Sequence, residues 1–368
     1  MRYSRREFLA VAGAVAGQLG SLPLARAADP PSRAVPWLAE IQTPPATVPA
    51  GVPELRPLLV DRLGNPVDTL DAWKQHRKTI EDTWLDFLKP VPAERPEPKI
   101  EVLSEDRPTG VIRQLVRYES EPGMSVEGCS LKPAAPPAKR PGVVVLHSTV
   151  DYTIRQPAGL EGPPEKFFGL KLAQRGYVAF CPRCFLWQGE GNYNQRVERF
   201  QREHPFSLGM AKMLFDAQRG LDLLETIPEV DNERLGTVGH SLGAKEALYL
   251  AAFDPRVQVA VSSEGGIGLP FSNWDAPWYL GEKIHKDDFK LQHHQVLSLV
   301  APRPFLLIGG DSADGARSWP YIEAVLPIYK LYGSQRPPVG LYNHGRGHAV
   351  PPAAERRIYE WFETYLPV

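Results

Sequence analysis

The chain has 368 residues, of which 43% are hydrophobic and 23% charged, and its formal net charge is −1. This composition is typical of a soluble globular protein that is long enough to bury a core on both faces of a sheet without a metal or a disulfide. A charge near zero, without long runs of one sign, argues against the electrostatic attraction that dominates binding to nucleic acids and anionic membranes.

The first 27 residues have the order of an export signal. The pair Arg5 and Arg6 precedes an apolar stretch rich in glycine and alanine, residues 10–24, and a small-x-small site ends at Ala27. That stretch is too short and too rich in glycine to span a bilayer comfortably, which favours a cleaved twin-arginine signal over a membrane anchor. We therefore expect a periplasmic or secreted protein without stable membrane association.

Residues 28–98 are predicted to form a proline-rich arm followed by a helix. Eight prolines between residues 29 and 57 indicate an extended segment that either wraps the domain or trails from it. Apolar residues at helical spacing predict an amphipathic helix from Asp71 to Leu88. An antiparallel edge of three strands is expected next, near residues 99–104, 111–118 and 124–131.

After Pro141, continuous apolar runs, typical of strands covered on both faces, alternate with helical segments. The predicted strands lie near residues 142–147, 177–180, 235–238, 257–261, 305–308 and 339–342. The predicted helices lie near residues 165–174, 208–226, 241–253, 322–332 and 353–365. This alternation predicts an α/β fold with a doubly wound, mostly parallel sheet in a domain that spans residues 99–368.

Two stretches, residues 185–204 and 265–294, interrupt this alternation. Binding sites in such sheets form outside the carboxyl ends of the strands, so both insertions are candidate walls of a pocket, with the second acting as a cap. The alternative is that they only cover exposed sheet edge. Trp274 and Trp278 fit either interpretation, since aromatic rings both pack in cores and stack on sugars.

The segment from Gly239 to Gly243 reads G-H-S-L-G between a predicted strand and a predicted helix. The G-x-S-x-G spacing suits a nucleophile on a strained strand-to-helix turn, where larger flanking side chains would collide with the backbone. The helix N-terminus behind the hydroxyl favours developing negative charge. Ser241 is therefore the predicted nucleophile.

A serine nucleophile needs a base and an acid that orients the base. His348, between the last strand and the last helix, is the predicted base, and His344 is the nearby alternative. Asp314 and Asp311 both follow the strand near residues 305–308, and we favour Asp314 because the acid in hydrolases often lies a few residues after the glycine. Glu264, after the preceding strand, is a third candidate that is equally suited to the floor of a pocket.

The oxyanion formed on attack needs backbone donors. The amide of Leu242, directly after the nucleophile, is one candidate. The second donor is expected from Ser148 or Thr149, which follow the strand near residues 142–147. A hydroxyl at either position is suited to assist.

With these motifs, the chain resembles the α/β-hydrolase superfamily, specifically its dienelactone-hydrolase-like and acetyl-xylan-esterase-like branch. The resemblance extends from about Pro141 to the C-terminus and is strongest in residues 239–248 and in the A-P-R-P segment at 301–304. It implies an α/β-hydrolase fold and ester hydrolysis. We expect no cofactor, because the sequence contains no cofactor motif. In dienelactone hydrolases proper the nucleophile is cysteine, so Ser241 argues against that particular chemistry.

The chain also resembles the glucuronoyl esterases, whose nucleophile motif is G-C-S-R-x-G-K-x-A-L. Ser241 and Lys245 match this spacing, and the segment of His293 before residues 301–304 looks similar. The resemblance implies that Lys245 contacts a sugar hydroxyl and that His293 lies near the substrate; alternatively, Lys245 is a helix-surface lysine paired to an acid. Leu242 departs from the family, which has arginine there.

Together these features predict an exported serine esterase that forms an acyl-enzyme on a carbohydrate ester such as acetylated xylan. The runner-up is a glucuronoyl methyl esterase, and a single-domain peptidase remains open. A different class of function is a catalytically silent hydrolase fold that binds glycans or a protein through residues 265–294. Of the three cysteines, Cys181 and Cys184 are expected to form a local disulfide or two packed thiols.

Overall fold

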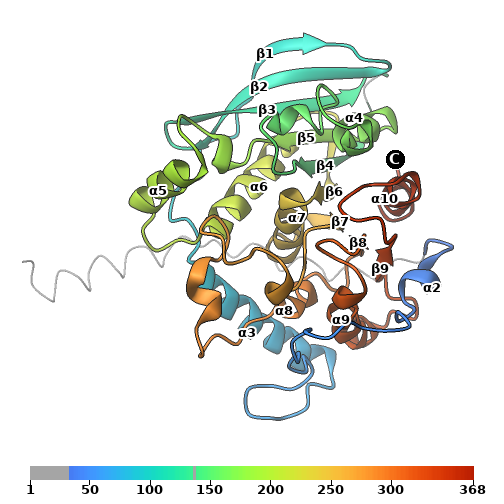
Figure 1. The fold of residues 1–368 in the computed structure, drawn as a ribbon. Coiled ribbons are helices and arrows are strands. Elements are labelled where there is room, and N and C mark those ends of the chain that lie inside the picture. The colour runs from blue at the N-terminus through green and yellow to red at the C-terminus, as the bar shows by residue number, and fades with distance from the viewer. Residues whose placement is uncertain (1–32, 136–137) are drawn as a thin grey trace, which may run out of the picture.

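The computed structural model describes residues 33–135 and 138–368, and within them the strands form one sheet (Figure 1). The strands are β1 Glu101–Asp106, β2 Val111–Glu121, β3 Met124–Pro133, β4 Arg140–Leu146, β5 Val178–Pro182, β6 Val230–His240, β7 Val257–Ser263, β8 Phe305–Gly309 and β9 Val339–Asn343. The α-helices are α2 Leu38–Ile41, α3 Leu70–Leu88, α4 Phe168–Gln174, α5 Tyr193–Glu203, α6 Gly209–Glu225, α7 Leu242–Phe253, α8 His293–Ser298, α9 Trp319–Leu331 and α10 Pro352–Tyr365.

The strand order is β1-β2-β3-β5-β4-β6-β7-β8-β9. Strands β1, β2, β3 and β5 pair antiparallel, whereas β5, β4, β6, β7, β8 and β9 pair parallel. Every residue of β5 and β8 is buried, as expected for strands that are covered on both faces. The predicted antiparallel edge and the mostly parallel, doubly wound sheet are both confirmed.

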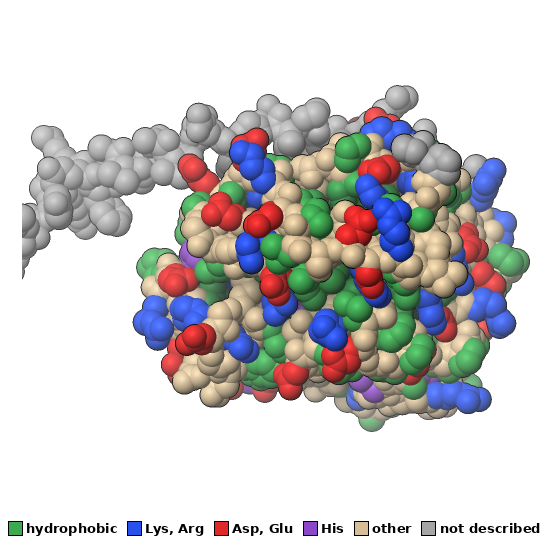
Figure 2. Space-filling view, turned by 90° about the horizontal axis from the view of Figure 1, so that it is seen from above, with side chains coloured by type: hydrophobic (Ala, Val, Ile, Leu, Met, Phe, Trp, Pro, Cys, Tyr) green, Lys and Arg blue, Asp and Glu red, His purple; other side chains and the backbone are tan. Residues whose placement is uncertain are grey.

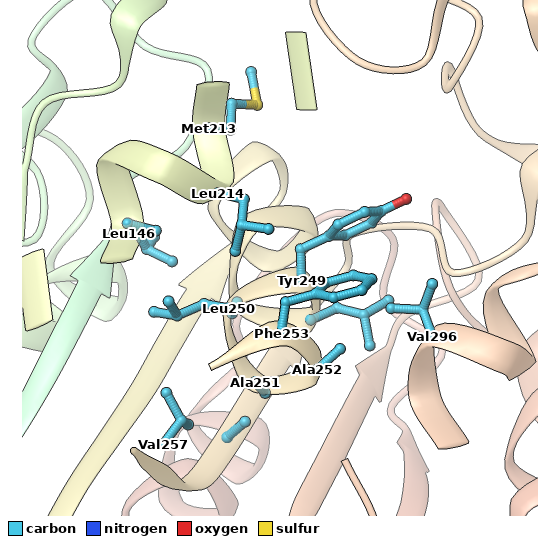
Figure 3. Packing of buried hydrophobic residues seen from close by; sticks show 14 of the residues in the cluster. Leu146, Met213, Leu214, Tyr249, Leu250, Ala251, Ala252, Phe253, Val257 and Val296 are labelled. Atoms are coloured by element: carbon cyan, nitrogen blue, oxygen red, sulfur yellow. The ribbon is translucent and has the colours of Figure 1, made fainter. Parts of the chain in front are cut away.

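Helices cover the two faces of the sheet, and each face has its own hydrophobic core (Figure 1). One core includes buried residues of α3, α6, α7, α8 and α9, and the other includes residues of α2, α4 and α10. Figure 3 shows α7 at the centre of the first core, with Tyr249 between Leu214 of α6 and Val296 of α8. Because α7 is surrounded in this way, all of its residues are buried.

The described part of the proline-rich arm wraps the domain rather than trailing from it. Trp37 donates a hydrogen bond from its indole nitrogen to Glu360 Oε2 of α10 at 2.6 Å. Ile41 packs against the backbone of β9 at Gly340, where a β-carbon would overlap it. The predicted export signal, residues 1–27, lies outside the described residues, and no helix within those residues is long and apolar enough to cross a membrane.

Both insertions carry short helices that the sequence analysis did not predict. The first holds a 3-10 turn at Phe185–Trp187 followed by α5, and the second leads through two 3-10 turns into α8. Cys181 and Cys184 are free, buried thiols that belong to different cores. Of the two expected arrangements, the local disulfide is therefore absent, and each thiol is instead packed in its own core. On the face in Figure 2, basic and acidic side chains are interspersed, in line with the low net charge.

Candidate active site

Ser241 lies on a sharp turn between β6 and α7, with φ 60° and ψ −118°. Its amide donates to the carbonyl of Ser263 at 2.9 Å, which fixes the turn against β7. A β-carbon at Gly239 would overlap the backbone of Gly243, and one at Gly243 would overlap the carbonyl of Leu146. Both glycines of the motif are therefore required by close backbone packing, and the strained serine conformation is the one that a nucleophile elbow needs.

His348 lies in the loop between β9 and α10, and 41% of its side chain is exposed. Its Nδ1 is 3.1 Å from Oε2 of Glu264, whose side chain is fully buried. Because the carboxylate accepts, we assign the proton to Nδ1, which leaves Nε2 as the acceptor for a hydroxyl proton. Within the part of the chain that the structure describes, no hydrogen bond joins Ser241 and His348, a contact that is often loose before substrate binds.

Glu264 follows β7 directly and has a positive φ of 54°. Its amide donates to the carbonyl of Ile308 at 2.8 Å, which holds the residue beside the end of β8. Its carboxylate accepts hydrogen bonds from the amides of Gly310 and, at 2.7 Å, Ala313. Four contacts therefore fix this residue, and its Oε2 is presented to His348.

The prediction that Asp314 orients the histidine is wrong. Asp314 is fully buried, but its carboxylate accepts from the amides of Gly266 at 2.6 Å and Ile267 at 2.8 Å, and from the hydroxyl of Ser318 at 2.7 Å. The loops after β7 and β8 thus each donate amides to the other's carboxylate. In this exchange Glu264 faces the imidazole and Asp314 braces the loop after β7; burial raises the pKa of Asp314.

The prediction is also wrong for Asp311, which is exposed and shapes the turn after β8. It has a positive φ of 65°, and its Oδ1 accepts from the side-chain amide of Asn343 at 2.8 Å. A short polar residue tolerates this backbone conformation because its side chain can bond locally. Asp311 therefore shapes the turn after β8 instead of orienting the histidine.

Two further histidines lie near His348. The ring of His240 is 4.7 Å from the ring of His348, and its Nδ1 is hydrogen-bonded to the hydroxyl of Ser263 at 3.1 Å. Burial is the main cause that lowers the pKa of His240 well below its ordinary value, so it stays neutral beneath His348. His344 accepts from the amide of Arg346 through Nδ1 at 3.1 Å and has no bond to Glu264, so the geometry favours His348 as the base.

Among the predicted oxyanion donors, the amide of Ser148 is already used, because it donates to Gln156 Oε1 at 3.1 Å. The Ser148 hydroxyl is buried without a partner, and the amide of exposed Thr149 has no acceptor among the described residues. The amide of Leu242 opens α7, where helices leave their first donors free. The donors that remain for an oxyanion are therefore the amide of Leu242 and either the hydroxyl of Ser148 or the amide of Thr149.

His147 braces this loop, a role that the sequence analysis did not assign. Its Nε2 accepts from the amide of Cys184 at 3.2 Å, so Nδ1 carries the proton and donates to the carbonyl of Ser148 at 2.7 Å. Burial lowers the pKa of His147 to about 4, which keeps the ring neutral. Gln156 was also missed, since no local pattern marks a glutamine that reaches back eight residues to Ser148.

Three predicted substrate-binding residues are instead sealed inside the molecule, two within the insertion at residues 265–294 and one beneath it. Lys245 is only 4% exposed, donates to the hydroxyl of Ser272 at 2.7 Å and lies 3.9 Å above the ring of Trp274. Trp274 is fully buried and donates to the carbonyl of Gly266 at 2.7 Å. Lys245 is thus buried against the insertion and does not lie on the helix surface, and burial lowers its pKa to about 7.

His293 is the third sealed residue, and its fully buried ring stacks 5.4 Å from Trp84. It donates from Nδ1 to the carbonyl of Ile267 at 2.7 Å and accepts at Nε2 from the hydroxyl of Tyr249 at 2.9 Å. Burial lowers its pKa to about 3. Of the predicted aromatic and basic binding residues, only Trp278 is partly exposed.

The sheet, the serine elbow and the histidine after the last strand define an α/β-hydrolase fold. Residues 126–277 match the Dienelactone hydrolase family. This match agrees with the branch that the nucleophile motif resembled.

Several known proteins with similar sequence or structure are named as esterases. Carbohydrate esterase MZ0003, from an unknown prokaryotic organism, is 24% identical over 145 residues, which are 34% of each chain, so the match spans about a third of that relative. A glucuronoyl esterase from Solibacter usitatus has a TM-score of 0.68 at 18% identity, covering 86% of this chain and 98% of that one. A CE15 glucuronoyl esterase from Teredinibacter turnerae T7901 has a TM-score of 0.62 at 20% identity, covering 84% and 89%.

Proposed function

We propose that this protein is an exported serine esterase that cleaves a carboxylic ester of a carbohydrate. The observation that carries the proposal is the pairing of His348 Nδ1 with the buried carboxylate of Glu264 at 3.1 Å. The ring of His348 is also 4.7 Å from that of His240, which directly precedes the serine on the strained elbow. Buried carboxylate, imidazole and strained serine are the parts of a hydrolytic triad. Export is supported by the twin-arginine pattern at Arg5 and Arg6.

The mechanism follows from these positions. Ser241 Oγ attacks the ester carbonyl while His348 Nε2 takes its proton, and Glu264 stabilises the imidazolium that forms. The amide of Leu242 and a donor from Ser148 or Thr149 hold the oxyanion. His348 returns the proton to the leaving alcohol, and the same groups then activate water to release the acid and free Ser241.

The preferred substrate is an acetyl ester on a polysaccharide such as xylan. The names of the similar proteins support a carbohydrate ester, and two features argue for the acetyl group over a glucuronate ester. Leu242 has no charge with which to polarise the oxyanion, and Lys245 is sealed away from solvent. A glucuronoyl methyl ester is the second candidate, since the spacing of Ser241 and Lys245 matches the glucuronoyl esterase motif.

The test uses the chain from Ala28 onward. Acid release is followed from acetylated xylan and from a methyl glucuronate ester, with Ser241→Ala as control; we expect acetate release that falls at least about 1000-fold in the variant. Release from the glucuronate ester alone would move the proposal to the second candidate. A loss of only a few-fold in Ser241→Ala would overturn the serine mechanism.

A serine-directed fluorophosphonate probe separates the esterase from a silent hydrolase fold. We expect the probe to label the wild-type chain and not Ser241→Ala. An unlabelled wild-type chain that still binds glycans would favour the binding protein. Export is checked separately by locating a variant with Arg5→Lys and Arg6→Lys, which is expected to stay in the cytoplasm.

A further inference from the structure

We propose that Trp187, Tyr193 and Trp278, here called the aromatic strip, together with Asp151 form a subsite for a pyranose ring of the carbohydrate ester, an inference that rests on the proposed function. The three rings come from three separate segments: the 3-10 turn after β5, the start of α5 and the insertion at residues 265–294. Sequence reasoning considered only Trp278 among them.

The rings of the strip are in contact one after another. The centroids of Trp187 and Tyr193 are 5.0 Å apart at 71°, and those of Tyr193 and Trp278 are 6.2 Å apart at 63°. Trp187 is 7% exposed and forms the base, whereas Tyr193 and Trp278 are partly exposed. Edge-to-face pairs of this kind hold ring orientations, so the strip presents preformed aromatic surface.

Tyr193 is fixed further by its place in the chain. It is the first residue of α5, whose start is capped reciprocally by Asn192 and Gln195. A capping box satisfies otherwise unpaired amides, and it therefore holds the first turn of the helix in place. The ring is thus held by backbone geometry as well as by its neighbours.

Asp151 joins the strip to the loop after β4. Its Oδ1 accepts from the hydroxyl of Tyr193 at 3.4 Å and from the indole of Trp187 at 3.5 Å. No described residue bonds its other oxygen, and the residue is exposed. Asp151 lies two residues after Thr149, and the ring of Trp187 is 5.0 Å from the ring of His147 at the start of the same loop, so the strip borders the loop that is proposed to supply an oxyanion donor.

This combination selects for a sugar. Aromatic rings contact the apolar C–H face of a pyranose, and a free carboxylate oxygen accepts its hydroxyl protons. An alkyl ester would gain nothing from the carboxylate. Trp274 shows what a purely structural tryptophan looks like in the same insertion, since it is fully buried and its indole nitrogen is bonded to backbone.

The experiment compares Tyr193→Ala, Trp278→Ala and Asp151→Asn with the matched control Phe206→Ala, an aromatic residue that is 78% exposed just beyond α5. For each variant, kcat/KM is measured on an acetylated xylo-oligosaccharide and on p-nitrophenyl acetate. We expect kcat/KM on the oligosaccharide, divided by kcat/KM on p-nitrophenyl acetate, to fall by about 3- to 10-fold in the strip variants because KM for the oligosaccharide rises. The same ratio should stay unchanged in the control. Ratios equal to that of the control would overturn the subsite.

Direct binding keeps this test independent of the proposed function. Ser241→Ala is titrated with deacetylated and glucuronate-substituted xylo-oligosaccharides while tryptophan fluorescence is followed. The subsite is supported if glycan binding quenches the fluorescence and the affinity falls by about 3- to 10-fold when Tyr193→Ala is added. No fluorescence response to either glycan overturns it. Failure of the serine mechanism would give a different result, because p-nitrophenyl acetate would then still be hydrolysed by Ser241→Ala.

Discussion

Replacing Glu264 by glutamine tests which of two buried carboxylates, Glu264 or Asp314, orients the catalytic histidine. The sequence alone does not distinguish them. The variant keeps the volume of the side chain but removes its charge, and one end of the amide must face a donor: the amide of Gly310, the amide of Ala313 or Nδ1 of His348. A buried hydrogen bond to a charged group contributes about 1.5 to 3 kcal/mol, so we expect Glu264→Gln to lower the free energy of unfolding by about that amount.

The effect on catalysis should be larger than the effect on stability. Loss of the acid that fixes the histidine tautomer costs about 10⁴-fold in kcat in a Ser-His-Asp triad on another fold, which corresponds to about 5.5 kcal/mol of transition-state stabilisation. The matched control is Asp314→Asn, which also loses a buried carboxylate that accepts two amides and a hydroxyl. We expect Asp314→Asn to lose similar stability but to keep kcat within about tenfold, because Asp314 does not contact His348.

The assay combines kcat on p-nitrophenyl acetate with urea unfolding followed by fluorescence. Equal losses of kcat in both variants, each matched to its loss of stability, would mean that the carboxylates act only by holding the loops. A kcat that collapses in Asp314→Asn and survives in Glu264→Gln would refute the assignment of Glu264. Either result would require a different position for the His348 loop.

Two further predictions concern the elbow and the sealed lysine. Gly243→Ala should lower the free energy of unfolding by about 3 kcal/mol or more and reduce activity, because its β-carbon would meet the carbonyl of Leu146; thermal unfolding checks this, and a variant as stable as wild type would contradict the close packing. Lys245→Met should flatten the pH dependence of stability. The pKa of Lys245 falls from 10.5 in the unfolded chain to about 7 in the fold. Between these two pH values the unfolded chain binds more protons than the folded chain, so the stability of the wild type rises with pH. Lys245 contributes at most about 1.4 kcal/mol per pH unit to this rise. Below pH 7 the wild-type chain bears the full cost of a buried charge, so the stability of Lys245→Met should exceed that of wild type most near pH 6 and least near pH 10. Urea unfolding at both pH values checks this, and an equal difference in the free energy of unfolding at the two would refute the buried ammonium.

The parts of this protein that the sequence predicts are those set by short stretches of chain. Short apolar runs between turn signals are typical of interior strands, so the positions of the parallel strands along the chain are readable without coordinates. The elbow is equally local, since the glycines that flank Ser241 are required by a turn of five residues. His348 follows from its place after the last strand.

The choice of acid and the accessibility of the binding residues depend on contacts between distant segments. Glu264 and Asp314 both follow buried strands, and only the exchange of amides between their loops decides which carboxylate meets His348. Likewise, Lys245 lies on a helix whose exposure depends on how residues 265–294 fold over it. A carboxylate or an amine has the same local pattern whether it faces solvent, backbone or imidazole, so its function is decided by what the tertiary structure brings against it.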